Sequence, residues 1–323
     1  EVRMSDGNIH GAETAVDAAG ITATGGDDPN GVSTSDATAQ ANADGASSKR
    51  RLGLGFWIAA GWLFIVFFAA VFAPWLPFKD PEKNFIVSGE RPPYAPSATH
   101  LFGTDQDARD LLARTVFGAR VSLTVGLVAI GMGMLFGGFM GIIAGYFRGW
   151  WDRVISFVFI IFLSFPALVL AILITALLER SLRTISITLG LLSIAPVGRV
   201  ARATTISFAD REFVLAARTL GAKNARIIIR ELLPNVLIPM SALALLGMAV
   251  AVVAEGGLAF LGLSVEKGPT WGKVILTGAG SRDLQKAPWI AIIPIIVLFL
   301  TVLALNFAGD RIRAYFDVRE TAL

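Results

Sequence analysis

The chain has 323 residues, of which 54% are hydrophobic and 16% are charged, and its formal net charge is +3. Soluble globular domains average about 45–50% apolar and about 25% charged residues, so this composition excludes an ordinary soluble domain. The positive charges lie between long apolar runs rather than on one basic face, which argues against nucleic acid as a partner.

The small net charge conceals a split between the start of the chain and the rest. Residues 1–48 hold eight acids and one base, a charge of −7, so the remainder carries +10. This first segment is rich in small and polar residues, and it cannot bury enough apolar surface to offset the entropy of ordering. We therefore expect residues 1–48 to form a disordered acidic tail.

After this tail, charge-free apolar runs alternate with charged connections. A helix needs about 20 mostly apolar residues to cross the hydrocarbon core of a bilayer. The fourth run has only 15 residues, so we expect its helix to continue past Gly198 and to carry Arg199 and Arg202 to the interface. The pattern predicts an all-α integral membrane protein with six transmembrane helices. The runs are 52–78, 121–147, 154–178, 184–198, 232–254 and 287–309.

Basic residues beside the spans predict the orientation, because short cytoplasmic loops are enriched in lysine and arginine. Such residues stand immediately before the first run, at 49–51, and after the last run, at 311 and 313. Both termini are therefore expected in the cytoplasm. The predicted order is a cytoplasmic tail (1–48), a first transmembrane helix (49–78), an extracytoplasmic segment (79–120), a membrane core (121–310) with a cytoplasmic loop (199–235), and a cytoplasmic C-terminal tail (311–323).

Glycines and prolines inside the runs predict local features of the helices. The second run has a glycine at every fourth position, and such a smooth stripe on one helix face lets another backbone approach closely. We interpret this stripe as a helix-packing surface. Proline inside the other runs predicts kinks. The glycines are Gly133, Gly137, Gly141 and Gly145, and the prolines are Pro166, Pro239 and Pro294.

Few groups in the chain could perform chemistry. There is no cysteine, and the two histidines, His10 and His100, lie in different segments and cannot assemble a metal site. The Gly272-Lys273 pair lacks the preceding glycine and the following hydroxyl of a phosphate-binding loop. We expect no catalytic residue, metal or cofactor in this chain, so that ATP-driven work would come from a partner.

Glu255 is the acid that lies inside an apolar stretch. An ionisable group within a membrane is a candidate for function. It could line a translocation pathway or gate, or it could be held by structural pairing near the interface. The sequence leaves both interpretations open.

The cytoplasmic segment 210–235 reads as two short helices. Asp210 is the expected N-cap of a helix over 211–220, and Gly221 is the expected stop. A second helix is expected over 223–233, ended by Pro234. The first helix offers an apolar face of small and large residues, as helices that dock into grooves of other proteins do. That face comprises Phe213, Leu215, Ala216, Ala217 and Leu220.

This segment resembles the EAA loop of ABC-importer permeases. The resemblance rests on Ala216-Ala217, Gly221 and Leu233-Pro234. It departs from the motif at Leu215, where the motif has glutamate, and at Glu231, where it has isoleucine; Glu212, one turn before Leu215, is the candidate substitute for the missing acid. The implied ATPase-coupling residues are Glu212, Phe213, Leu215, Ala216, Ala217, Arg218, Leu220, Gly221, Leu233 and Pro234.

Further motifs between residues 100 and 317 resemble the second permease subunit of dipeptide and oligopeptide importers. Ala108 stands where the first of these motifs has glycine. The motifs are His100–Asp105 with Arg109-Asp110, Gly118–Leu123, Phe165-Pro166, Phe260–Leu263, Pro269–Gly272, Ala287–Trp289, and Leu305-Asn306 with Gly309-Asp310.

The resemblance implies the fold of a type I ABC importer permease in a bacterial cytoplasmic membrane. Its implied partners are a sister permease subunit, two ATP-binding subunits that hold ATP and magnesium, an extracytoplasmic substrate-binding protein, and the lipid bilayer. Loops 79–120 and 264–286 would face the binding protein. Glu255, Trp271 and Trp289 are candidates for the pathway or an outer gate.

The implied function is ATP-driven import of di- and oligopeptides. Two alternatives stay open at this point. A nickel or haem importer would use the same architecture, because the permease motifs do not encode the solute. An ion-driven secondary carrier belongs to a different class, and Glu255 is the residue that favours it.

Overall fold

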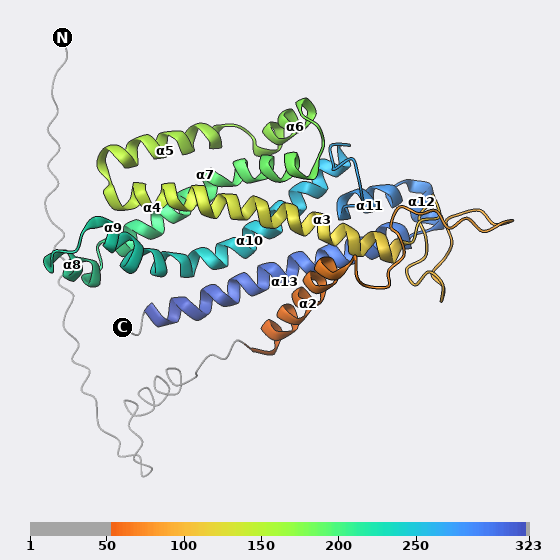
Figure 1. Ribbon diagram of the computed structural model, residues 1–323, viewed down its shortest axis with the longest axis horizontal. Helices are drawn as coiled ribbons and strands as arrows, with labels where there is room; N and C mark the ends of the chain where they lie inside the picture. Colours follow the sequence, from red (N-terminus) through yellow and green to blue (C-terminus); the bar gives the residue numbers. More distant parts are fainter. Residues whose placement is uncertain (1–52, 321–323) are drawn as a thin grey trace, which may run out of the picture. The chain divides into compact units, whose positions relative to one another are not determined.

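The computed structural model describes residues 53–320, with the side chains of residues 53–316 (Figure 1). The predicted acidic tail, residues 1–48, lies outside the described residues. Within the described range the regular structure is helical, apart from two isolated bridges that pair Asn84 with Arg109 and Thr104 with Asp110. The predicted all-α class is confirmed.

The helices follow one another in the order predicted from the apolar runs. Five of those described are long and apolar enough to cross a membrane, and the bent pair α5–α6 makes a sixth if it counts as one span. The elements are α2 (Gly53–Phe72), α3 (Leu111–Met132), the π-helix η1 (Gly133–Gly137), α4 (Gly138–Phe147), α5 (Gly149–Ser164), α6 (Ala167–Leu177), α7 (Leu182–Ala209), α8 (Glu212–Thr219), α9 (Asn224–Arg226), the π-helix η2 (Ile227–Leu232), α10 (Leu233–Phe260), α11 (Trp271–Gly278), α12 (Ser281–Lys286) and α13 (Trp289–Glu320).

The second span is one continuous helical stretch, Leu111–Phe147, formed by α3, η1 and α4. It begins ten residues before the charge-free run at 121. Asp110 caps the start of α3, because its carboxylate accepts a hydrogen bond of 2.9 Å from the backbone N–H of Ala113. Arg114 is buried in the first turn. The boundary predicted at residue 120 therefore cuts through this helix.

The glycine stripe of the second span packs directly on α7. A Cβ atom at Gly133 would lie 2.5 Å from the hydroxyl oxygen of Ser193, and one at Gly145 would lie 2.8 Å from the carbonyl oxygen of Arg202. A real Cβ atom essentially never comes so close to another atom. The interpretation of the stripe as a helix-packing surface is confirmed, and α7 is its partner.

The third span is broken rather than kinked. Helices α5 and α6 meet at an angle of 77°, with Phe165 and Pro166 between them. Phe165 is extended (φ −90°, ψ 134°), as the ring of a following proline favours, and Pro166 has no N–H to continue the helix. In Figure 1 the pair turns sharply between the α5 and α6 labels.

The prolines elsewhere do not interrupt their helices. Helix α7 runs through Pro196 and carries Arg199 and Arg202 beyond Gly198, as predicted for the short fourth run. Helix α10 includes Pro239 and helix α13 includes Pro294. Helix α3 packs against α7 and α10, and α10 packs against α13, so the buried core lies along these helices.

Candidate functional site: the docking element and the buried Glu255 cluster

Helix α8 projects between α7 and η2 as a separate short helix, and it carries most of the predicted coupling residues. It begins at Glu212, after Arg211 in extended conformation. Asp210 is not its N-cap: it ends α7, and its carboxylate binds the guanidinium of Arg148 at 2.6 Å. The predicted cap was wrong: Arg211 precedes α8, and the carboxylate of Asp210 pairs instead with Arg148 in the turn between α4 and α5.

The end of α8 follows the prediction. Gly221 adopts φ +78°, the left-handed conformation that glycine accepts without strain. Its N–H donates to the carbonyl of Arg218 at 2.9 Å, and the N–H of Ala222 donates to the carbonyl of Ala217 at 3.0 Å. This pair of bonds is a Schellman motif, which satisfies carbonyl groups that the helix end would leave unpaired.

Helix α8 divides its apolar side chains between an inner and an outer face. Val214 is fully buried, and Ala217 is half-buried against the same core. Leu215 and Ala216 point outward, and Leu220 is 87% exposed. The predicted Ala216-Ala217 patch is therefore split, and the surface left for a partner is an outer face of Phe213, Leu215, Ala216 and Leu220, which we call the α8 outer face.

Glu212 lies exposed in the first turn of α8. A carboxylate there interacts favourably with the helix dipole. Among the described residues no salt bridge to Glu212 is found. Its side chain is thus accessible to a partner.

The second predicted helix does not end at Pro234. The chain is helical from Asn224 to Phe260, and residues Ile227–Leu232 form a π-helix just before the proline. Pro234 cannot donate a backbone hydrogen bond, and its ring would clash with a carbonyl one turn earlier in a regular α-helix. The wider π turn accommodates it. The side chain of Asn235 donates to the carbonyl of Glu231 at 2.6 Å.

Two side chains that the sequence did not single out contact the docking element, defined here as residues 210–234. Tyr146 donates a hydrogen bond of 2.9 Å to the side-chain oxygen of Asn224, and Arg148 pairs with Asp210. Both lie where α4 meets α5. No sequence pattern links these positions across 62 to 78 residues, so the signal exists only in the folded chain.

Glu255 is fully buried among hydroxyl groups from two parts of the chain, α3 and the connection between α10 and α11. Ser122 of α3 donates to its Oε2 at 3.0 Å, and Ser264 of the α10–α11 connection donates to its Oε1 at 3.1 Å. The Ser264 hydroxyl also lies 3.2 Å from the hydroxyl of Thr270. Glu255 therefore ties α10 to α3 and to the connection that follows.

The two candidate gate tryptophans lie in different places. Trp271 is fully buried; its backbone N–H donates to Ser122 at 3.1 Å, and its indole N–H donates to the carbonyl of Thr115 at 3.0 Å. The structure thus joins Trp271 to the Glu255 cluster through Ser122. Trp289 is only half-buried, and its indole N–H lies 3.4 Å from the carbonyl of Thr104, outside that cluster.

An apolar pocket of about 500 Å³ lies between α3, α6, α7 and α10. The α10 face that lines it includes Val250, Ala251, Ala254 and Leu258. Glu255 is not among the lining residues, because its side chain turns toward Ser122 on α3. In this conformation Glu255 links α10 to α3 and does not face the pocket.

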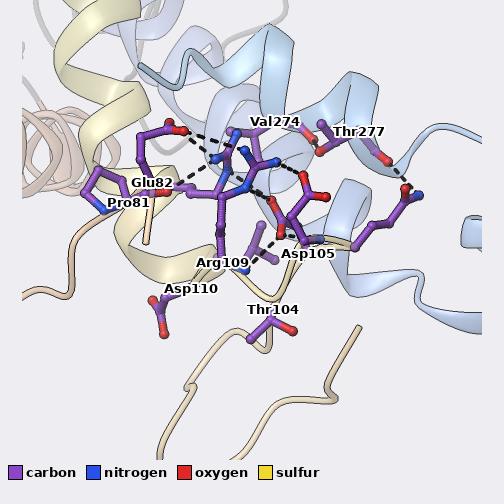
Figure 2. A network of polar contacts seen from close by, with 12 residues as sticks. Pro81, Glu82, Thr104, Asp105, Arg109, Asp110, Val274 and Thr277 are labelled. Carbon is purple, nitrogen blue, oxygen red and sulfur yellow. Dashed lines mark hydrogen bonds and ion pairs between the residues drawn. The ribbon is translucent and has the colours of Figure 1, made fainter. Parts of the chain in front are cut away.

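A charged network fixes the irregular segment before α3. Figure 2 shows Asp105 and Arg109 turned toward each other beside Glu82. The Arg109 Nε lies 2.8 Å from Asp105, and the buried Arg114 reaches both Asp105 and Glu82 at 3.4 Å. Gln106 donates to the carbonyl of Thr277 in α11 at 3.3 Å. This segment is thus held to both α3 and α11.

The α10–α11 connection is organised around one ammonium group. Lys273 donates to the carbonyls of Val265, Glu266 and Gly268 at 3.2, 2.9 and 3.2 Å. Burial lowers the pKa of Lys273, because removal from water disfavours its charged form. The network and this connection both lie at the end of the helical bundle away from α8 (Figure 1).

Replacement of Glu255 by alanine is expected to lower the stability of the protein. The hydroxyls of Ser122 and Ser264 would lose their acceptor, and each unsatisfied buried group costs about 1–3 kcal/mol. Glu255→Gln retains the shape and one acceptor oxygen, so its effect should be smaller. The midpoint of thermal unfolding in detergent measures this, with the exposed Glu179→Ala as control. An unchanged midpoint for Glu255→Ala would contradict the structural role.

The chain resembles known transport proteins in sequence and in fold. The sequence model of the family described as "Binding-protein-dependent transport system inner membrane component" matches residues 137–321. The dipeptide transport system permease protein DppC of Alkalihalophilus pseudofirmus is 42% identical over 224 residues, 69% of this chain and 73% of that protein. The glutathione transport system permease protein GsiD of Shigella dysenteriae is 31% identical over 260 residues, 80% of this chain and 84% of that protein.

A solved structure shares the fold. It is the inward-facing MetNI methionine ABC transporter, one chain of which aligns with a TM-score of 0.50 at 19% identity, covering 64% of this chain and 96% of that chain. The helical architecture therefore matches a type I ABC importer permease. With 57% of its length matched by the family model and a relative of 42% identity, the chain belongs to the family of binding-protein-dependent transport system inner membrane components, as a multi-pass permease subunit rather than an enzyme.

Proposed function

We propose that the chain is the permease subunit of an ATP-driven importer of di- and oligopeptides. The observation that carries this proposal is the 42% identity to a dipeptide permease over 224 residues. A second relative is a permease for glutathione, which is itself a tripeptide. The nickel or haem importer and the ion-driven carrier are not favoured, because both relatives are peptide permeases.

In this proposal the docking element receives the force of ATP hydrolysis. The α8 outer face would insert into a groove on an ATP-binding subunit, as an amphipathic helix does. ATP and magnesium would be bound by that partner. Closure of two such subunits would displace α8 and rock the spans between inward-facing and outward-facing states.

The proposed topology places both termini and α8 in the cytoplasm of a bacterial cell. The network around Asp105 and the α10–α11 connection would then face a substrate-binding protein outside. A sister permease subunit would complete the pathway. The ordered loops support this arrangement, since a docking surface for a soluble partner has to hold its shape.

Replacement of Leu220 by aspartate tests the docking assignment. Leu220 is 87% exposed, so a charge there should not disturb folding, but it would be buried unpaired in a partner groove. We expect co-purification of the ATP-binding subunit and ATP-dependent dipeptide uptake to fall at least tenfold. The matched control is Leu101→Asp, an exposed leucine outside the membrane helices, which should retain the ATP-binding subunit. Full co-purification with Leu220→Asp would refute α8 as the docking helix.

A further inference from the structure

The turn between α4 and α5 contacts the docking element at three points. The hydroxyl of Tyr146 donates to the side chain of Asn224 at 2.9 Å. The guanidinium of Arg218 lies over the Tyr146 ring, 5.2 Å from its centre. Arg148 pairs with Asp210 at 2.6 Å. Figure 1 shows α8 and α9 at the end of α4 where α5 begins.

The contacts made by Tyr146 are stronger than the ion pair of Arg148, because the Tyr146 ring is buried. The ring belongs to the same apolar cluster as Val214 and Ile227, two buried side chains of the docking element. Both side chains of the Arg148–Asp210 pair are largely exposed, and exposed ion pairs contribute little. Tyr146 therefore holds the base of α8 in two ways, through its packed ring and through the hydrogen bond from its hydroxyl to Asn224.

Helices α4 and α5 are in turn fixed to α7. A Cβ atom at Gly141 would lie 2.8 Å from the Cβ of Ala201, so the α4 backbone rests on α7. Arg202 of α7 holds Asp152 of α5 through two hydrogen bonds, one of them 2.7 Å between Nη2 and Oδ2. The first turns of α5 are therefore fixed to both α4 and α7.

Helix α5 leads to the break at Pro166 and then to α6. Ala167, Leu168 and Ala171 of α6 line the apolar pocket between α3, α7 and α10. A continuous set of contacts thus runs from the base of α8 through Tyr146 to α4, along α5, and to the pocket wall. The covalent connections of the docking element, by contrast, lead only into α7 and α10.

We propose that Tyr146 is a positioning residue that attaches the docking element to the α4–α5 arm, so that displacement of α8 also moves the broken span α5–α6. The inference rests on the proposed function and adds a second route for the motion. If the covalent connections alone transmitted the motion, Tyr146 would be dispensable for coupling.

The test uses the assembled transporter, with its ATP-binding and sister subunits, in proteoliposomes supplied with binding protein and a labelled dipeptide. Dipeptide uptake per ATP hydrolysed is the readout, because a loss of folded protein lowers both quantities together and leaves their ratio unchanged. We expect Tyr146→Ala to lower this ratio at least fivefold while the ATP-binding subunit still co-purifies.

Tyr146→Phe keeps the buried ring and removes only the hydroxyl, so it tests the inference even if Tyr146→Ala fails to fold. We expect a two- to threefold loss of the ratio, matched by Asn224→Ala and not deepened in the double variant. Tyr94→Phe is the control, since it removes a hydroxyl that bonds backbone groups in the segment before α3. A ratio within 1.5-fold of wild type for Tyr146→Phe would overturn the inference, whether or not Tyr146→Ala folds.

A second readout does not depend on the solute. The chain has no cysteine, so one spin label can be placed on α6, at Leu168→Cys, and one on α2, outside the docking element and the α4–α5 arm, at Ile65→Cys, both exposed positions. ATP should change the distance between the labels in wild type and change it less in Tyr146→Phe. An equal change in both would overturn the inference. Absence of dipeptide uptake by wild type, with the ATP-dependent distance change intact, would instead reject the peptide as the solute.

Discussion

Replacement of Gly221 by valine is expected to lower ATP-dependent uptake at least tenfold. Gly221 has φ +78°, a region that a β-branched residue adopts only under strain, at a cost of about 1–3 kcal/mol. Relief of that strain would open the two Schellman hydrogen bonds and turn α8 away from η2. Uptake and co-purification of the ATP-binding subunit measure the effect.

The control for this prediction is Gly89→Val. Gly89 also has positive φ, +90°, and a Cβ atom at either glycine meets no atom within 4 Å, so both variants impose conformational strain without a steric clash. Gly89 lies before α3, far along the chain from the docking element. We expect its variant to keep uptake within twofold of wild type. Equal losses in both variants would show that the effect of Gly221→Val is not specific to the docking element.

Replacement of Gly141 by alanine is expected to destabilise the protein by about 1–3 kcal/mol, the usual cost of overpacking. The new methyl group would lie 2.8 Å from both the Cβ of Ala201 and the backbone nitrogen of Arg202, and it would also meet the carbonyl oxygen of Gly198. Backbone atoms cannot rotate away, so α4 and α7 would have to separate. The midpoint of thermal unfolding in detergent should fall.

The matched control is Gly138→Ala, three residues earlier on the same helical stretch. A Cβ atom there meets nothing within 4 Å, and alanine favours helix more than glycine by about 1 kcal/mol. We expect an unchanged or raised unfolding midpoint. A similar fall for both variants would mean that the stretch responds to lost flexibility rather than to the contact with α7.

Features that depend on local sequence were predictable. The apolar runs gave the spans and their order, because the length of a spanning helix is set by bilayer thickness. Gly221 was recognised as a helix stop, since left-handed backbone strongly favours glycine. The regular spacing of Gly133, Gly137, Gly141 and Gly145 indicated one packing face, although only the structure shows that α7 is its partner.

Features that depend on distant partners were not predictable. A charge-free run could not reveal that α3 begins at Leu111, because Arg114 is buried beside acids from another segment. The sequence predicted Asp210 as an N-cap, whereas in the structure its carboxylate pairs with Arg148. The partners of Glu255 lie 133 and 9 residues away, so its place among hydroxyls could not be read from its neighbours.

Proline was the least predictive local signal. Pro166 breaks its span by 77°, whereas Pro239 and Pro294 lie within continuous helices, and Pro234 follows a π-helical turn. The same residue type thus gives different results according to the packing around it. Helices held on several sides tolerate the lost hydrogen bond, while residues 161–169 around Pro166 are all exposed within this chain.

The break between α5 and α6 sets a requirement on the surroundings of the protein. Hydrocarbon offers no hydrogen-bond partner, so exposed irregular backbone is tolerated at membrane depth only against protein or water. Helix α2 is compatible with lipid along its length, because its backbone N–H and C=O groups are hydrogen-bonded within the helix and its exposed side chains are apolar. The backbone at the break around Phe165 and Pro166 is not hydrogen-bonded within a helix in this way. In a bilayer this backbone therefore needs either a partner chain or water on the α5–α6 side.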